Sequence, residues 1–234
     1  MLVIIASRHD AAASALAERW SAHNAALLTC EDLSVVGWCH HLNAAGVSTA
    51  VISGRVVATT EITGVLTRLP CVTESELAHI VPADRAYVAA EMTAFLTFWL
   101  SELVCPVLNR PTPVCLMGPN WRTERWIHAA AQLGIPVCPS YRQATLTADV
   151  SAAVSKQRPI ALTVVGHHCF GEGDAMLTMH ARRLAAAAGV DLLTVYLSGS
   201  ESGARLLGAE LWADISSPDI ANAILDYLCG ESRC

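Results

Sequence analysis

Two short runs of histidine and cysteine carry the side chains best suited to binding a metal ion. Cys39-His40-His41 lies in the N-terminal part of the chain, and His167-His168-Cys169 shows the same residues in reverse order. Imidazole and thiolate are ligands for zinc and copper, and two runs brought together would supply four ligands. Adjacent histidines on a strand point to opposite faces, so each run would offer about two, and the spacing matches no standard zinc template. A metal-binding protein that uses His40, His41, His167, His168 and Cys169 is therefore one alternative.

Arginines near the expected ends of strands and helices form a second group of candidates. A guanidinium group binds carboxylate or phosphate through two parallel hydrogen bonds. Lys156 is the only lysine in the chain, so phosphate binding would depend on arginine. Each of these arginines would also suit an ordinary solvated helix face. The residues expected to line a ligand site are Arg68, Asn109, Arg110, Asn120, Trp121 and Arg125.

The elements that must position these residues begin with a β-α-β pattern. Leu2–Ala6 and Ala25–Leu28 are short apolar runs typical of strands, and between them lies an alanine-rich helix with Asp10 as its N-cap. This order predicts an α/β fold with a parallel sheet and a helix on one face. No Gly-x-Gly-x-x-Gly follows the first strand, so the dinucleotide-binding fingerprint is absent.

Further strands and helices are expected to follow up to Gly134, and an antiparallel pair of strands is expected after it. A hairpin turns at Ser53-Gly54-Arg55, a long apolar helix follows Asp84, and a helix over 121–133 is capped by Asn120 and closed by Gly134. The second part reads as a central strand over 159–165, an antiparallel pair over 191–197 and 205–211, and a final helix over 217–228. The stretch 143–157 is the expected boundary between two lobes.

Composition and charge exclude several classes of protein. The chain has 234 residues and a formal net charge of −6 without a basic cluster, which argues against nucleic acid as a partner. No run is long and apolar enough for a membrane span, and the N-terminus lacks the features of a signal peptide, so we expect a cytoplasmic protein. Nine cysteines without a CxxC pair are expected to be mostly buried thiols. The Gly-x-Ser-x-Gly motif of serine hydrolases is absent from the sequence.

The order of several motifs resembles that of RimK-like ATP-grasp ligases. The segments that carry the resemblance are ITGVLTRLP (62–70), DRAYVAAEMTAFLTFWL (84–100), GPNWRTERWIHAAAQLGIPVCPSY (118–141) and the C-terminal part from His180. The resemblance implies an N-terminal pre-ATP-grasp-like lobe with a parallel sheet, followed by a truncated α+β ATP-grasp-like lobe. It places the first domain at 1–110, a linker helix with an extended segment at 111–145, and the C-terminal lobe at 146–234.

The chain departs from that family where the family holds its nucleotide. Only about two dozen residues separate Ile135-Pro136-Val137 from the strand at Thr163, where the family inserts a lid subdomain with ATP-binding lysines. The resemblance places Gly208 and Glu210 at the positions of a Glu-x-Asn pair that holds magnesium in the family. Lys156 alone cannot replace two phosphate-binding lysines.

These departures predict a non-catalytic ATP-grasp-derived protein that binds a partner protein, a peptide or a small acid, as an accessory subunit of a biosynthetic or modification system. No cofactor is expected, and Glu210 joins the candidate ligand-binding residues. The alternative is an active ATP-dependent carboxylate–amine ligase that uses Mg-ATP and binds phosphate through arginines. A homodimer or an obligate protein partner is expected because the apolar surface that a lid would cover needs another partner.

Overall fold

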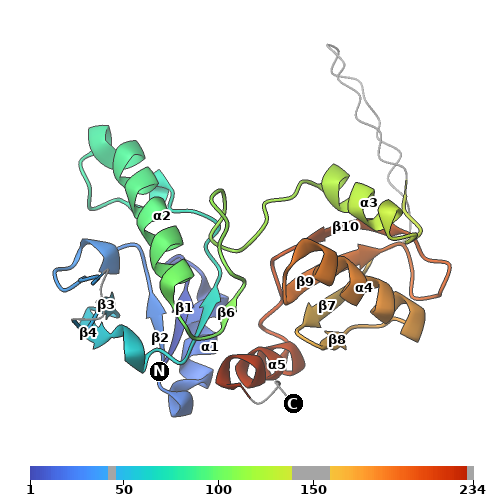
Figure 1. Ribbon diagram of the computed structural model, residues 1–234, viewed down its shortest axis with the longest axis horizontal. Coiled ribbons are helices and arrows are strands. Elements are labelled where there is room, and N and C mark those ends of the chain that lie inside the picture. The colour runs from blue at the N-terminus through green and yellow to red at the C-terminus, as the bar shows by residue number, and fades with distance from the viewer. Residues whose placement is uncertain (42–45, 139–158, 231–234) are drawn as a thin grey trace. The chain divides into compact units, whose positions relative to one another are not determined.

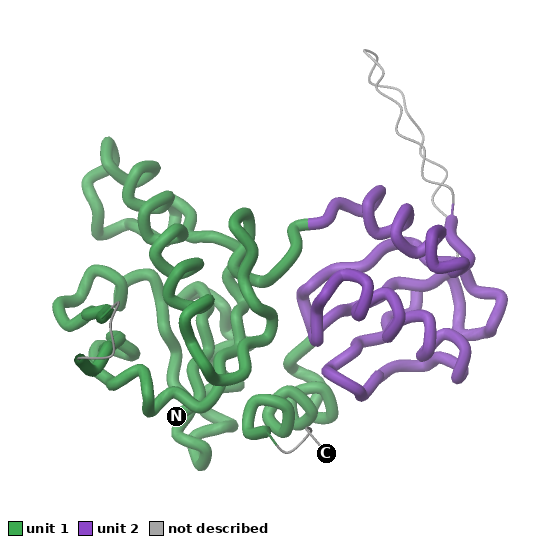
Figure 2. The backbone as a smooth tube through the Cα atoms, viewed as in Figure 1, with its two compact units in different colours: residues 1–120, 214–234 green, residues 121–213 purple. Residues whose placement is uncertain are grey.

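A computed structural model describes residues 1–41, 46–138 and 159–230 of the chain. These residues form two compact units, Met1–Asn120 with Asp214–Cys234 as unit 1 and Trp121–Ala213 as unit 2 (Figure 2). The expected lobe boundary at 143–157 lies outside the described residues. The domain limits at 110 and 145 refer to the parts of a family resemblance, and they stay a prediction.

Unit 1 is built on a four-stranded parallel sheet in the order β2-β1-β5-β6 (Figure 1). Its strands are β1 (Leu2–Ile5), β2 (Ala25–Leu28), β5 (Gly64–Thr67) and β6 (Val107–Leu108). Every residue of β1 and β5 is buried, as in parallel strands covered on both faces. The predicted parallel sheet is confirmed, and its strands are the apolar runs of the sequence.

Helices cover both faces of this sheet. On one face, Val3, Ile5 and Val65 share a hydrophobic cluster with Leu96 and Trp99 of α2 (Arg85–Glu102). The unit also contains α1 (Ala11–Arg19) and the C-terminal helix α5 (Pro218–Cys229), which packs on β5. The Asp10 side chain accepts a hydrogen bond from the Ala13 amide at 3.0 Å, so the predicted N-cap of α1 is confirmed.

A hairpin of β3 (Thr49–Ile52) and β4 (Arg55–Ala58) follows β2 and turns at Ser53-Gly54, as predicted. Short 3₁₀ turns link the larger elements of the unit. They are η1 (Ser21–His23), η2 (Asp32–Ser34), η3 (Thr59–Glu61), η4 (Glu74–Glu76) and η5 (Pro82–Asp84).

Unit 2 is a four-stranded antiparallel sheet in the order β10-β9-β7-β8, with two helices on one face (Figure 1). The strands are β7 (Ile160–Val165), β8 (His168–Phe170), β9 (Leu192–Leu197) and β10 (Leu206–Glu210), and the helices are α3 (Thr123–Gln132) and α4 (Ala175–Ala188). Trp126 of α3 and Leu184 of α4 join Leu162, Val195 and Leu206 of the strands in one core. The predicted central strand and the antiparallel pair are confirmed.

Unit 2 departs from the sequence-based expectation in two places. The run from Gly166 to Gly171, for which no strand was predicted, folds back as β8, and Gly166 makes the turn with a positive φ of 55°. The helix expected over 121–133 begins at Thr123, and its N-cap residue is Arg122 in an extended conformation rather than Asn120. Trp121 therefore lies before the helix.

No helix among the described residues is both long and apolar enough to cross a membrane.

Candidate functional site

The carboxyl edge of the parallel sheet in unit 1 gathers several charged side chains. In open α/β sheets, ligands bind beyond the carboxyl ends of the strands. Arg68 follows β5, and its Nε donates to Oδ2 of Asp10 at 2.9 Å, with only 5% and 12% of the two side chains exposed. The other oxygen of Asp10 caps α1. Arg68 is thus part of a mostly buried ion pair that joins the end of β5 to the start of α1.

A second ion pair lies at the same edge and is open to solvent. Arg8 follows β1, and its Nη1 donates to Glu31 at 2.6 Å, while its Nε donates to the His9 ring at 3.1 Å. Arg8, Asp10 and Glu31 are not among the ligand-site residues predicted from the sequence. The signal that would have found them is their place just after the first two strands, because parallel strands bring such positions together.

Asn109 and Arg110 follow β6. Asn109 is 3% exposed. The Arg110 guanidinium donates to the carbonyls of Leu100, Leu103 and Cys105 at 2.8–3.0 Å, so it satisfies carbonyl groups at the C-terminal end of α2. This geometry gives Arg110 a structural role, and the predicted contact of both residues with a ligand stays a prediction.

Asn120, Trp121 and Arg125 are near the start of α3. Asn120 and Arg125 are exposed, and Trp121 is half-buried. The Arg125 guanidinium lies 4.6 Å above the Trp121 ring, whose other neighbour is the Trp126 ring at 4.7 Å. The stack holds the Arg125 charge over an aromatic face, which attracts a cation electrostatically. Contact of this stack with a ligand stays a prediction.

Glu210 ends β10, the edge strand of the sheet in unit 2. Its Oε1 accepts a short hydrogen bond from the hydroxyl of Tyr196 on β9. Burial, together with this hydrogen bond and the negative charge of Glu210, raises the pKa of Tyr196 to about 12. Tyr196 therefore stays a proton donor across the physiological range and holds the carboxylate against the sheet.

Gly208 lies two residues before Glu210 and pairs with Tyr196 across the ladder. A Cβ added there would meet the Thr123 methyl carbon at 3.4 Å, an ordinary contact. Crowding does not require glycine at this position, but glycine offers no side chain that could bind a ligand. On β7 and β9, the hydroxyls of Thr163 and Thr194 lie 3.1 Å apart and are buried.

The histidine and cysteine runs lie in different units. In unit 1, Cys39 Sγ lies 3.4 Å from His41 Nε2, and the His40 ring packs edge-on against Phe98. In unit 2, His167 and His168 are exposed where β7 turns back into β8. Burial raises the pKa of the neighbouring Cys169 thiol. Among the described residues, no group of three or more His, Cys, Asp or Glu side chains could hold a metal ion. Metal binding stays a prediction.

Comparison with known proteins gives the fold but no relative in sequence. No protein-family model and no curated protein matches the chain. The ATP-grasp ligase PsnB, solved with a minimal precursor, Mg and ADP, superposes with a TM-score of 0.68 at 13% identity, covering 100% of this chain and 98% of PsnB. A RiPP-associated ATP-grasp ligase of Chryseobacterium gregarium also gives 0.68, at 10% identity and 99% and 97% coverage. The macrocyclase MdnC of Microcystis aeruginosa, bound with precursor peptide MdnA, gives 0.65 at 12% identity and 97% and 99% coverage.

The chain is thus an ATP-grasp-like protein in its fold, with the parallel sheet and the antiparallel sheet expected for that class. This confirms the resemblance inferred from the order of the motifs.

Proposed function

We propose that this chain is an ATP-grasp-derived protein that binds a peptide and does not transfer phosphate. The similar structures support a peptide as the partner, because MdnC is bound with a precursor peptide and PsnB is complexed with a minimal precursor. A small acid and a folded partner protein are the other ligands that the sequence favours.

The proposed loss of phosphate transfer rests on two residues near the end of β10. The family resemblance places a magnesium-binding Glu and Asn at Gly208 and Glu210. Gly208 has no side chain, and the Glu210 carboxylate is held by Tyr196. Mg²⁺ needs several oxygen ligands, and phosphoryl transfer depends on the metal clamp. A single lysine, Lys156, further limits phosphate binding.

Isothermal titration with Mg-ATP tests the loss of nucleotide binding. We expect no saturable heat from Mg-ATP or Mg-ADP, because Gly208 offers no metal ligand and Lys156 is the single lysine of the chain. Micromolar binding of either nucleotide would contradict the proposal.

A hydrolysis assay examines the alternative of an active carboxylate–amine ligase. That alternative predicts ATP hydrolysis stimulated by a substrate acid, abolished by Glu210→Ala and retained in Glu201→Ala, an exposed acid in the turn between β9 and β10. We expect no hydrolysis above background in any of the three proteins.

We also propose that the chain forms a homodimer or a complex with an obligate protein partner. Large apolar side chains such as Val36, Tyr87 and Val104 are more than two thirds exposed, and such surface usually marks an interface. Light scattering should give a mass well above the 24.9 kDa of one chain. A monodisperse species of that mass with no co-purifying protein would argue against both forms.

A further inference from the structure

An apolar groove of about 280 Å³ lies beside α2 in unit 1. Leu33 and Trp38 line it from η2 and the following loop, and Met92 and Phe95 line it from α2. Glu91 is the charged residue of its lining. Pockets for whole small molecules usually hold about 300–1,000 Å³. The groove is just below that range, which suits one or two large side chains of a bound chain.

The aromatic wall of the groove is held in place before anything binds. The Trp38 indole NH donates to the Asp32 carbonyl at 2.8 Å. Its ring meets Phe95 and Trp99 edge-on, at centroid distances of 5.1 and 5.5 Å. A wall that is already ordered costs little conformational entropy on binding. Met92 on the same helix is flexible and adapts to the shape of an inserted side chain.

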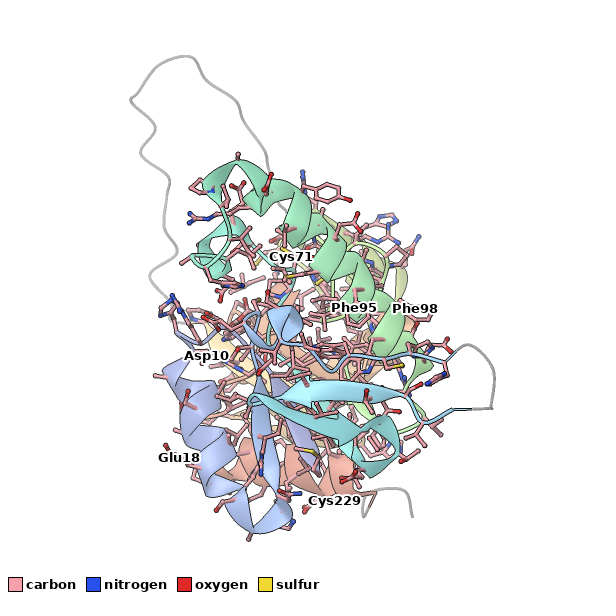
Figure 3. The ribbon with its side chains drawn as sticks, turned by 90° about the vertical axis from the view of Figure 1, so that its left-hand side faces the viewer. Asp10, Glu18, Cys71, Phe95, Phe98 and Cys229 are labelled. Carbon is pink, nitrogen blue, oxygen red and sulfur yellow. The ribbon has the colours of Figure 1, made fainter. Side chains whose placement is uncertain are left out.

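Exposed apolar side chains extend the surface around the groove. Val35 and Val36, 41% and 94% exposed, lie between Leu33 and Trp38 in the chain. Tyr87 and Phe98 are exposed on α2 itself, where Phe95 and Phe98 both project from the helix (Figure 3). A surface helix of a globular protein normally keeps its large apolar residues on the buried face. In α2 they lie on both faces, which indicates that the exposed face has a binding partner.

The charges beside the groove indicate the sign of that partner. Glu91 is exposed on the groove. Arg85, at the start of the same helix, donates to the carbonyls of Ile80 and Ala78 instead. With the net charge of −6 on the whole chain, the groove therefore favours a basic ligand.

We propose that this groove docks a peptide segment that inserts one large apolar side chain beside Trp38 and Met92 and places a lysine or arginine against Glu91. This inference rests on the proposed function for the nature of the partner, and it adds the place and the chemistry of recognition. The apolar anchor supplies most of the affinity, as buried aromatic contacts do at other interfaces, and Glu91 supplies the charge preference.

Selection from a random display library of about twelve-residue peptides tests the proposal on the full-length chain. Enriched peptides are synthesised and titrated into the wild type, Glu91→Arg and Glu102→Arg. Glu102 is the matched control, because it is another exposed acid on α2 that does not line the groove. We expect enriched peptides to combine a large apolar residue with Lys or Arg. Their affinity should fall at least about tenfold with Glu91→Arg and stay unchanged with Glu102→Arg.

A charge exchange completes the test. Replacing the basic residue of an enriched peptide by Glu should weaken binding to the wild type and restore it to Glu91→Arg. Peptides that bind all three proteins equally would overturn the groove and leave the proposed function standing. Failure to enrich any peptide would overturn the proposed function as well. A change of oligomeric state in Glu91→Arg alone would show that the groove holds a second copy of this chain, and would equally overturn the inference.

Discussion

At the scale of single residues, the side chains predicted to bind a ligand differ in the hydrogen bonds and ion pairs that they make within the chain. Arg110 donates to three carbonyls, Arg68 pairs with Asp10, and Glu210 accepts from Tyr196. Arg125 instead lies exposed on the Trp121 ring. The type of a side chain shows which ligands it could bind. The fold determines how many of its hydrogen-bonding groups are already engaged within the chain.

Arg68→Met should be strongly destabilising. The change leaves the Asp10 carboxylate mostly buried without its cation, and such losses cost about 3–5 kcal/mol. Arg8→Met is the matched control, because it breaks the exposed Arg8–Glu31 pair, worth about 0–1 kcal/mol. Urea titration gives the free energy of unfolding of both variants. Equal losses would show that Arg68 is not a structural residue.

The contribution of Tyr196 to the stability of the protein should be lost in strong alkali. Its pKa is raised to about 12 in the folded chain, against about 10 in an unfolded one, so the folded state holds the proton more tightly. The associated stability is fully present below pH about 10 and is lost as the pH rises toward about 12. In Glu210→Gln the pKa should fall but stay above its ordinary value, because burial is the larger cause. Absorbance titration, with Tyr196→Phe as the reference, measures the pKa of Tyr196 in the wild type and in Glu210→Gln. An unchanged pKa in Glu210→Gln would refute the role of the carboxylate.

At the scale of elements, close contacts rather than residue preferences set how helices dock. Gly64 at the start of β5 is one such place. A Cβ added there would lie 2.9 Å from Leu228 Cβ and 3.0 Å from the Leu228 carbonyl oxygen of α5. The absence of a side chain at Gly64 therefore lets α5 approach the strand.

Gly64→Ala should destabilise unit 1, because α5 must move away from the sheet. Overpacking of this kind costs about 1–3 kcal/mol. Gly199→Ala is the control, since no described atom lies within 4 Å of the Cβ it would add. Thermal unfolding should show a lower Tm for Gly64→Ala only. Equal Tm values would mean that α5 packs more loosely than the distances indicate.

At the scale of the whole molecule, the chain leaves unit 1 after Asn120 and returns to it at Asp214. The returning helix α5 buries Ile220, Ala221, Ile224 and Leu228. The stability of unit 1 therefore depends on residues that follow the whole of unit 2 in the sequence.

Ile224→Asp should loosen unit 1 and leave unit 2 intact. Ile224 is fully buried, and a charge at such a position costs about 4 kcal/mol or more. Asn222→Asp introduces the same residue at an exposed position of α5 and should be neutral. Hydrogen exchange is expected to speed up in β1 and β5 and to stay unchanged in β7 and β9. Faster exchange in β7 and β9 alone would contradict the assignment of α5 to unit 1.

Most of the elements and the class of the fold could be predicted from the sequence. Apolar runs such as Leu2–Ile5, the cap at Asp10 and the order of motifs from ITGVLTRLP onward are local signals, so they can be recognised without the tertiary structure. The places of Gly208 and Glu210 at altered metal positions are implied by the family resemblance rather than by a local signal, and they stay a prediction.

Which side chains contact one another could not be predicted without the fold of each unit. The pairs Arg68–Asp10 and Tyr196–Glu210 and the groove between Trp38 and α2 join residues far apart in the chain. The return of α5 to unit 1 and the strand at His168–Phe170 were likewise not foreseen. The physical reason is that such contacts depend on sheet order and helix docking, which arise from the packing of the whole unit, whereas a strand or a cap is set by a few neighbouring residues.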